Sequence, residues 1–179
     1  MGRILLLVVG LVIVAMPAAA AARSQAHVPT PGFVVVRNAA TDGGITGKPV
    51  ATVVVRGFVL GHIAQEGAVQ LYHLASGAGS LAAQAAGVDV SRRAVTYHSR
   101  GVTVPGTEYS GSDFRFRAVG GVWRVVVYGA GLSLYAGGVG RVSLHGSVAY
   151  PGTDGHYSFN GGRFVSLPTG VVKGRLGTK

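Results

Sequence analysis

The chain of 179 residues contains no cysteine, although its N-terminal segment has the pattern of an export signal. Small exported domains are often held together by disulfide bonds. The absence of cysteine excludes a disulfide framework, and it also excludes lipid attachment at an N-terminal cysteine. The folded part must therefore be stabilised by burial of apolar side chains and by pairing of its backbone groups alone.

Acidic residues are scarce as well. Six Asp and Glu stand against sixteen Lys and Arg, which gives a net charge of +10. A strongly basic protein outside the cytoplasm attracts anionic cell-wall polymers and membrane headgroups. Nucleic acid is not expected as a partner, because export removes the chain from most of it. The oligomeric state cannot be read from these features.

The first 22 residues have the features of a secretory signal peptide. Arg3 supplies a positive start, Ile4–Met16 is apolar, and a proline and five alanines follow. Small residues at the end of such a segment fit the signal peptidase. Cleavage sites are present after Ala20, Ala22 and Ala26, and we favour the site after Ala22.

An uncleaved membrane anchor is the alternative. Ile4–Ala22 is a run of 19 residues without a polar side chain, which is the length at which a membrane-spanning helix becomes a candidate. Its proline and alanines favour cleavage. Both interpretations place the rest of the chain outside the cytoplasm. We expect a protein that is secreted or associated with the envelope, or one held by a single span.

Beyond the signal, the composition predicts an all-β domain. Thirty glycines accompany valine-rich segments, which is typical of short strands joined by tight turns. We predict a linker at 23–31, one domain at 32–170 and a polar tail at 171–179. Short strands with turn signals between them favour a single antiparallel β-sandwich of the jelly-roll kind after the signal helix. A short β-solenoid or a barrel is the alternative.

Most of the domain is assigned to strands by β-branched runs or by alternation. The predicted strands are 32–37, 51–63, 69–74, 94–98, 101–104, 114–119, 122–128, 132–135, 141–145, 156–159 and 163–167. Pro105 is expected to end one of them. Segment 76–87 is the one candidate helix, with a loop as the alternative. Hairpin turns are predicted at Gly120–Gly121 and at Asn160–Gly162.

The first of these hairpins generates the only candidate binding site. With Gly120 and Gly121 in the turn, Arg117 pairs with Arg124. Period-two alternation then sorts the side chains. The core face receives Phe114, Phe116, Trp123, Val125 and Val127, and the other face receives Arg115, Arg117 and Arg124. Arginines directly opposite each other repel, and guanidinium groups suit phosphate and carboxylate. The pattern has two interpretations: a solvated arginine face, which we favour, and an anion-binding patch, which is the candidate site. Glu108 or Asp113 could neutralise the cluster.

No catalytic or metal-binding pattern is found. The six histidines do not share the spacing of a metal site, and no serine has the G-x-S-x-G frame. The glycine-rich segments lead into strands and not into a helix N-terminus that binds phosphate. Glu108 and Asp113 are acids that could flank a sugar, but the sequence fixes no distance between them. We expect no metal and no cofactor, and the sequence leans against an enzyme.

The function that follows is a non-catalytic binding or structural module that contacts an anionic envelope polymer through arginine. A small extracellular hydrolase acting on envelope polymer and a small-molecule carrier are the alternatives.

The export prediction is tested by N-terminal sequencing of the protein from culture medium and from membranes. We expect the medium to contain a mature chain that begins at Arg23, because cleavage after Ala22 fits the signal best. Recovery of the whole protein in membranes with Met1 intact would show that the apolar run is retained as an anchor.

Overall fold

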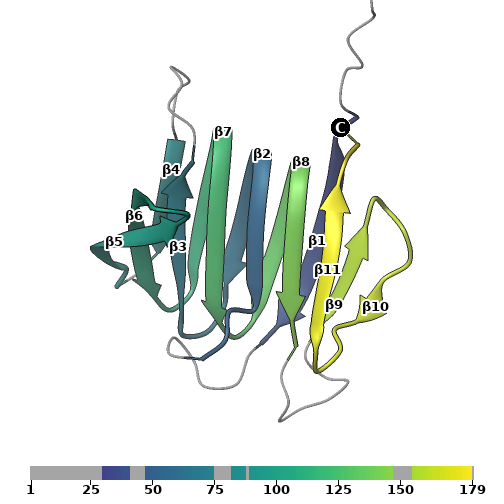
Figure 1. Cartoon of the computed structure of the whole chain (residues 1–179). Helices are drawn as coiled ribbons and strands as arrows, with labels where there is room; N and C mark the ends of the chain where they lie inside the picture. The colour runs from purple at the N-terminus through teal and green to yellow at the C-terminus, as the bar shows by residue number, and fades with distance from the viewer. Residues whose placement is uncertain (1–29, 41–46, 75–81, 88, 147–154, 179) are drawn as a thin grey trace, which may run out of the picture.

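The computed structural model describes residues 30–40, 47–74, 82–87, 89–146 and 155–178. Within these residues the chain forms strands and no helix (Figure 1). The strands are β1 (Gly32–Ala39), β2 (Ala51–Ile63), β3 (Gly67–His73), β4 (Ala82–Gly87), β5 (Ser91–Ser99), β6 (Val102–Gly111), β7 (Phe114–Gly129), β8 (Leu132–His145), β9 (His156–Phe159), β10 (Val165–Ser166) and β11 (Val171–Leu176).

All these strands belong to one antiparallel sheet. Its order is β10-β9-β1-β8-β2-β7-β3-β6-β5, and in addition β11 pairs with β8 and β4 pairs with β7. The sheet is not closed into a barrel, since β5–β6 and β9–β10 lie at opposite sides of the molecule (Figure 1). The prediction of an all-β domain is confirmed. The alternative prediction of a barrel is therefore wrong. The alternative of a β-solenoid is also wrong, because a solenoid stacks its strands in parallel and this sheet is antiparallel.

The predicted signal helix, the three cleavage sites and the linker up to residue 29 lie outside the described residues. In the part of the chain that the structure describes, no helix is long and apolar enough to cross a membrane.

Two predicted segments need correction. The helix at 76–87 is wrong for Ala82–Gly87, because these residues form β4 and pair with β7. Pairing with the sheet outweighs the helix propensity of the alanines. The polar tail at 171–179 contains β11, which pairs with β8 along its whole length. The folded domain therefore extends to Leu176, whose side chain is buried.

The prediction that Pro105 ends a strand is also wrong, because β6 continues through it. Pairing of β6 with β3 begins only at Gly106, so the missing N–H of Pro105 costs no hydrogen bond to β3. The Asn160–Gly161 hairpin is confirmed. Both turn residues have positive φ, 52° and 74°, and β9 pairs with β10 across them.

The predicted hairpin at Gly120–Gly121 is wrong, because Phe114–Gly129 is a single strand of 16 residues. The two glycines, with φ of 71° and 69°, form a β-bulge in β7. They lie opposite the single residue Gly57 of β2, since the pairing jumps from Arg56↔Val122 to Phe58↔Val119.

This bulge has the same effect on side-chain alternation as a two-residue turn. Before it the core residues of β7 are at even positions, such as Phe114 and Phe116, and after it they are at odd positions, such as Trp123 and Val125, while Val126 is buried outside this core cluster. The core face is therefore assigned correctly from the sequence, although the hairpin that suggested it does not exist.

The bulge belongs to a line of glycines that divides the three central strands into two halves. Gly138 of β8 lies so close to β2 that a Cβ on it would overlap the carbonyl oxygen of Arg56. The first half contains residues 51–56, 122–129 and 139–145, flanked by β3 and β11. The second half contains residues 58–63, 114–119 and 132–137, flanked by β4 and β1.

The sheet bends back on itself at this line. Gly67 pairs with both Gly111 and Gly129, and three residues lead from Gly111 to Phe114. The two ends of β7 thus lie within about 20 Å of each other, whereas a straight strand of this length spans about 50 Å. Buried side chains of both halves form one cluster, in which Val53 and Leu144 of the first half join Phe114 and Leu132 of the second.

Because the strands approach closely at the glycine line, a methyl group added at Gly138 should destabilise the fold strongly. We expect Gly138→Ala to lower the free energy of unfolding by about 2–4 kcal/mol, because its φ of 136° and its contact with β2 both exclude a side chain. Gly170→Ala is the matched control, since nothing lies within 4 Å of its Cβ position. Urea denaturation of both variants measures the difference, and equal midpoints would contradict the importance of the line.

Candidate anion-binding face

Three arginines lie in one row across the first half of the sheet, on the face opposite the core. Arg124 of β7 pairs with Val54 of β2, and Val54 pairs with Arg141 of β8. Arg141 pairs in turn with Arg175 of β11. Paired residues of an antiparallel sheet share a face. Because neighbouring strands are about 4.8 Å apart, Arg124 and Arg141 are about 10 Å apart in the backbone, and Arg141 and Arg175 about 5 Å.

A second row of polar residues runs beside the first. Thr52 of β2 pairs with Ser143 of β8, and Ser143 pairs with Lys173 of β11. Ser143 and Lys173 are two positions from Arg141 and Arg175, and Thr52 is two positions from Val54, so both rows face the same side. We call Arg124, Arg141, Lys173 and Arg175 the basic row.

The basic row lines a groove in the surface. One hollow of about 470 Å³ is bounded by Arg124, Arg141, Lys173 and Arg175 together with the hydroxyl residues Thr52 and Ser143. A second hollow of about 630 Å³ adjoins it and shares Val54, Arg141 and Arg175. The cations therefore border a continuous depression and do not project singly from a flat surface.

No carboxylate neutralises the basic row within the described residues. The ion pairs found there are Arg93–Glu108, at 2.6 Å, and His62–Asp113, at 2.7 Å. Neither includes a member of the row. Asp42 and Asp154 lie outside the described residues. Arg141 and Arg175 thus face each other directly, an arrangement that costs free energy unless an anion lies between them.

The β5–β6 hairpin folds over the end of the row. β5 lies three strands from β7 in the sheet order, yet the Tyr97 ring of β5 stacks on the Arg124 guanidinium at 4.3 Å. Tyr97 also packs against Tyr72 of β3, with ring centroids 5.6 Å apart. This cover orients Arg124 by a cation–π contact. It leaves Nε of Arg124 buried and without a hydrogen-bond partner among the described residues.

Glu108 ties the hairpin to the sheet. Its side chain is 3% exposed, and its two oxygens accept hydrogen bonds from Arg93 Nε, at 2.6 Å, and Gln70 Nε2, at 2.7 Å. The Tyr72 hydroxyl donates to Gln70 in the same network. Burial by itself raises the pKa of Glu108. The hydrogen bonds from Arg93 and Gln70 and the charge of Arg93 outweigh it, so that the pKa lies below its usual range.

The phenols around Arg124 titrate differently according to their surroundings. Burial raises the pKa of Tyr72 and of Tyr128, and the charge of Glu108 adds to both shifts. A hydrogen bond with Ser99 lowers the pKa of Tyr97, and the positive charge of Arg124 lowers it further. The three rings supply aromatic surface and hydroxyl groups to one end of the row.

The structure does not bring the three predicted patch residues together. Arg115 and Arg117 are exposed in the second half of the sheet, where they pair with His62 and Leu60 of β2. Arg117 and Arg124 are seven residues apart along β7 and lie on opposite sides of the glycine line at which the strand bends. The predicted pairing of Arg117 with Arg124 is wrong. The two arginines that pair directly across strands are Arg141 and Arg175.

Sequence reasoning missed Arg141, Lys173 and Arg175 as site residues. Alternation in 171–176 was the available signal, since Lys173 and Arg175 alternate with Val172, Gly174 and Leu176 in the way of a half-buried strand. These residues align with Arg124 only through the pairing of β7, β2, β8 and β11, and a local sequence pattern does not predict such pairing.

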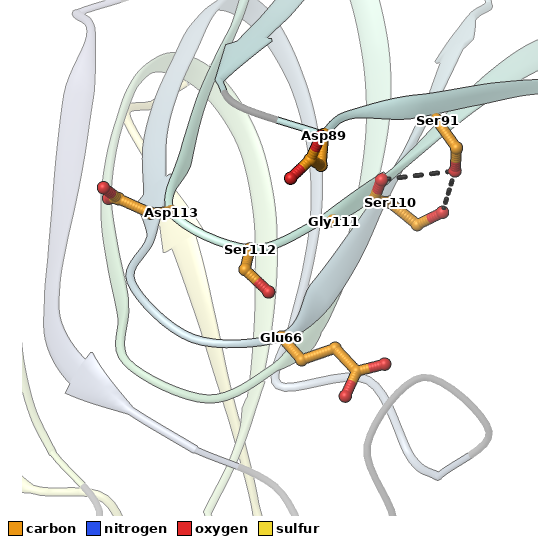
Figure 2. Close-up of a pocket in the computed structure, with 7 residues that line it drawn as sticks. All are labelled: Glu66, Asp89, Ser91, Ser110, Gly111, Ser112 and Asp113. Carbon is orange, nitrogen blue, oxygen red and sulfur yellow. Dashed lines mark hydrogen bonds between the residues drawn. The ribbon is translucent and has the colours of Figure 1, made fainter.

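An acidic hollow of about 480 Å³ lies elsewhere, lined by Glu66, Asp89, Asp113 and three serines. Figure 2 shows that the carboxylates do not converge, because Asp113 points away from Glu66. Ser91 and Ser110 hydrogen-bond to each other at 2.7 Å. Within the described residues no group of three histidines or acids is arranged to hold a metal ion. Glu108 and Asp113 do not face each other, since the first is buried in its network and the second pairs with His62 on the surface.

No protein-family model matches the chain, and neither a curated protein nor a solved structure matches it.

The Glu108 network makes a prediction about pH. Because its folded pKa is depressed, Glu108 stabilises the fold above its ordinary pKa of 4.5, and this contribution is lost as the pH falls through the folded value. Glu108→Gln should lower the free energy of unfolding by about 1–3 kcal/mol at pH 7 and have a smaller effect in acid. Denaturant titrations from pH 3 to 7 measure this, with the exposed Glu66→Gln as control. A constant difference between the two variants at all pH values would contradict it.

Proposed function

We propose that this domain is a non-catalytic module that binds an anionic polymer of the cell envelope at the basic row. The observation that carries the proposal is the alignment of three arginines and a lysine along one groove, none of which forms an ion pair within the described residues. Arginine forks bind carboxylate, sulfate and phosphate groups in pairs of hydrogen bonds. A ligand with repeated charges relieves the repulsion along the whole row.

Export fits this proposal. The N-terminal residues have the composition of a signal peptide or a single anchor, and either would place the domain among envelope polymers and membrane headgroups. The chain has no cysteine, so the fold tolerates both oxidising and reducing surroundings without rearrangement of disulfides.

We further propose that the folded-over sheet is a β-sandwich whose two layers are the two halves on either side of the glycine line. The single buried cluster, to which both halves contribute, supports this arrangement. A sandwich presents its two outer faces in opposite directions. The basic row of the first half and the Arg115–Arg117 pair of the second half would then be separate surfaces.

The hydrolase alternative has less support. Its candidate carboxylates either take part in structural hydrogen bonds, as Glu108 does, or point apart around an open hollow (Figure 2). General acid–base chemistry on a sugar needs two carboxyl groups a fixed distance apart on either side of the bond. The described residues offer no such pair.

A comparison of two double variants tests the proposal. Arg141→Ser/Arg175→Ser should weaken binding to immobilised dextran sulfate by about tenfold to a hundredfold, because two charge-assisted contacts are lost. Arg115→Ser/Arg117→Ser removes the same charge from exposed positions outside the row and should have a small effect. Binding is measured from 50 to 300 mM salt, where the wild-type should lose affinity steeply.

The opposite ranking of the two variants would transfer the site to the patch predicted from the sequence. An equal effect of both would indicate attraction by net charge alone.

A further inference from the structure

We infer that the basic row selects phosphodiester groups over carboxylates, so that its ligand is a phosphate-linked polymer that crosses the strands. This inference rests on the proposed function and specifies its ligand class. Its first support is the direct pairing of Arg141 with Arg175. The Cβ atoms of such a pair are about 5 Å apart, so both guanidinium groups reach one anion.

The geometry of the anion decides between the two chemistries. A carboxylate has two coplanar oxygens, which a single guanidinium fork satisfies. A phosphodiester has two free oxygens in a tetrahedral arrangement, so that two arginines can each bind one of them from different sides. Two opposed arginines therefore suit a tetrahedral group better than a planar one.

Polar residues beside the arginine pair add further donors. Lys173 is a compact charge of the kind that binds phosphate, and Thr52 and Ser143 place two hydroxyl groups in the same hollow. Hydroxyl groups donate to phosphate oxygens and also form hydrogen bonds with free hydroxyl groups of the units between the phosphates in a polymer. The groove thus offers one lysine, two hydroxyls and the arginine pair around one position.

Arg124 supplies a second position along the same line. It lies about 10 Å from Arg141 in the backbone, and the apolar Val54 stands between them. Its buried Nε has no partner among the described residues, and the Tyr97 ring holds the guanidinium against the sheet. Two anionic positions separated by an apolar one match a polymer with charges at intervals, lying at right angles to the strands.

The test compares three soluble probes of similar length at one salt concentration. They are a poly(glycerol phosphate), a polygalacturonate and a single-stranded oligonucleotide, each titrated into the exported domain by calorimetry. We expect poly(glycerol phosphate) to bind about tenfold more tightly than polygalacturonate. Arg175→Lys should abolish this preference, because it keeps the charge but removes the planar fork. Arg115→Lys is the matched control outside the row and should preserve the preference.

The possible failures are distinguishable. Equal binding of the phosphate and carboxylate polymers would overturn the inference and leave the proposed function intact. No binding of either polymer, or binding unaffected by Arg141→Ser/Arg175→Ser, would overturn the proposed function itself. Tighter binding of the oligonucleotide would overturn the assignment to an envelope polymer.

Vesicles of phosphatidylglycerol, with phosphatidylcholine vesicles as control, determine the source of the group. They carry the same glycerol phosphodiester on a lipid. Weaker binding to these vesicles than to the soluble polymer would support the polymer, and tighter binding would overturn it in favour of a membrane surface.

Discussion

The placement of two glycines of β7 opposite one glycine of β2 is the constraint on which the rest of the structure depends. In β7 the apolar core residues lie at even positions before the bend and at odd positions after it, so without an extra residue Trp123, Val125 and Val127 would point away from the core. Gly120 and Gly121 add that residue to β7, whereas β2 and β8 pass the same line without one and keep their core residues at positions of a single parity. The core face therefore stays continuous through the bend.

The same constraint fixes the opposite face. Alternation of 123–127 keeps Trp123, Val125 and Val127 in the core and so directs Arg124 outward. Buried Val142 and Leu144 direct Arg141 outward, and buried Leu176 directs Arg175 outward. A slip of one residue in any of these strands would bury an arginine and expose a valine or leucine, at a cost of several kcal/mol. The register of the basic row is thus maintained by the core and needs no contact among the arginines themselves.

How much of this could be predicted from the sequence depends on the range of the interactions involved. The β2 boundaries and the Asn160–Gly161 turn follow from local patterns, and both are confirmed. The pair Gly120–Gly121 was ambiguous, because a two-residue turn and a bulge produce the same change of alternation. What distinguishes them is Gly57, whose place opposite the pair is set by pairing across more than sixty residues.

The candidate site was the least predictable part for the same reason. Arg124, Arg141 and Arg175 come from three different strands, and only the antiparallel registers of β7, β2, β8 and β11 align them. The predicted pairing of Arg117 with Arg124 is wrong, and the arginines that pair across strands are Arg141 and Arg175. Of the three residues in the predicted patch, Arg124 lies in the basic row, whereas Arg115 and Arg117 lie in the other half of the sheet.

Among the described residues, the positions of the few acids leave the basic row without an ion pair. Of the described carboxylates, Glu108 is used inside the network that fastens the β5–β6 hairpin, and Glu66, Asp89 and Asp113 line a separate hollow (Figure 2). A single carboxylate beside Arg141 and Arg175 would remove their repulsion at little cost in sequence. The described acids lie in other parts of the structure. Arg124 instead stacks on the Tyr97 ring, a cation–π contact that orients the guanidinium without neutralising its charge. An anion bound between Arg141 and Arg175 would remove their repulsion. The free energy released in this way would add to the free energy of binding.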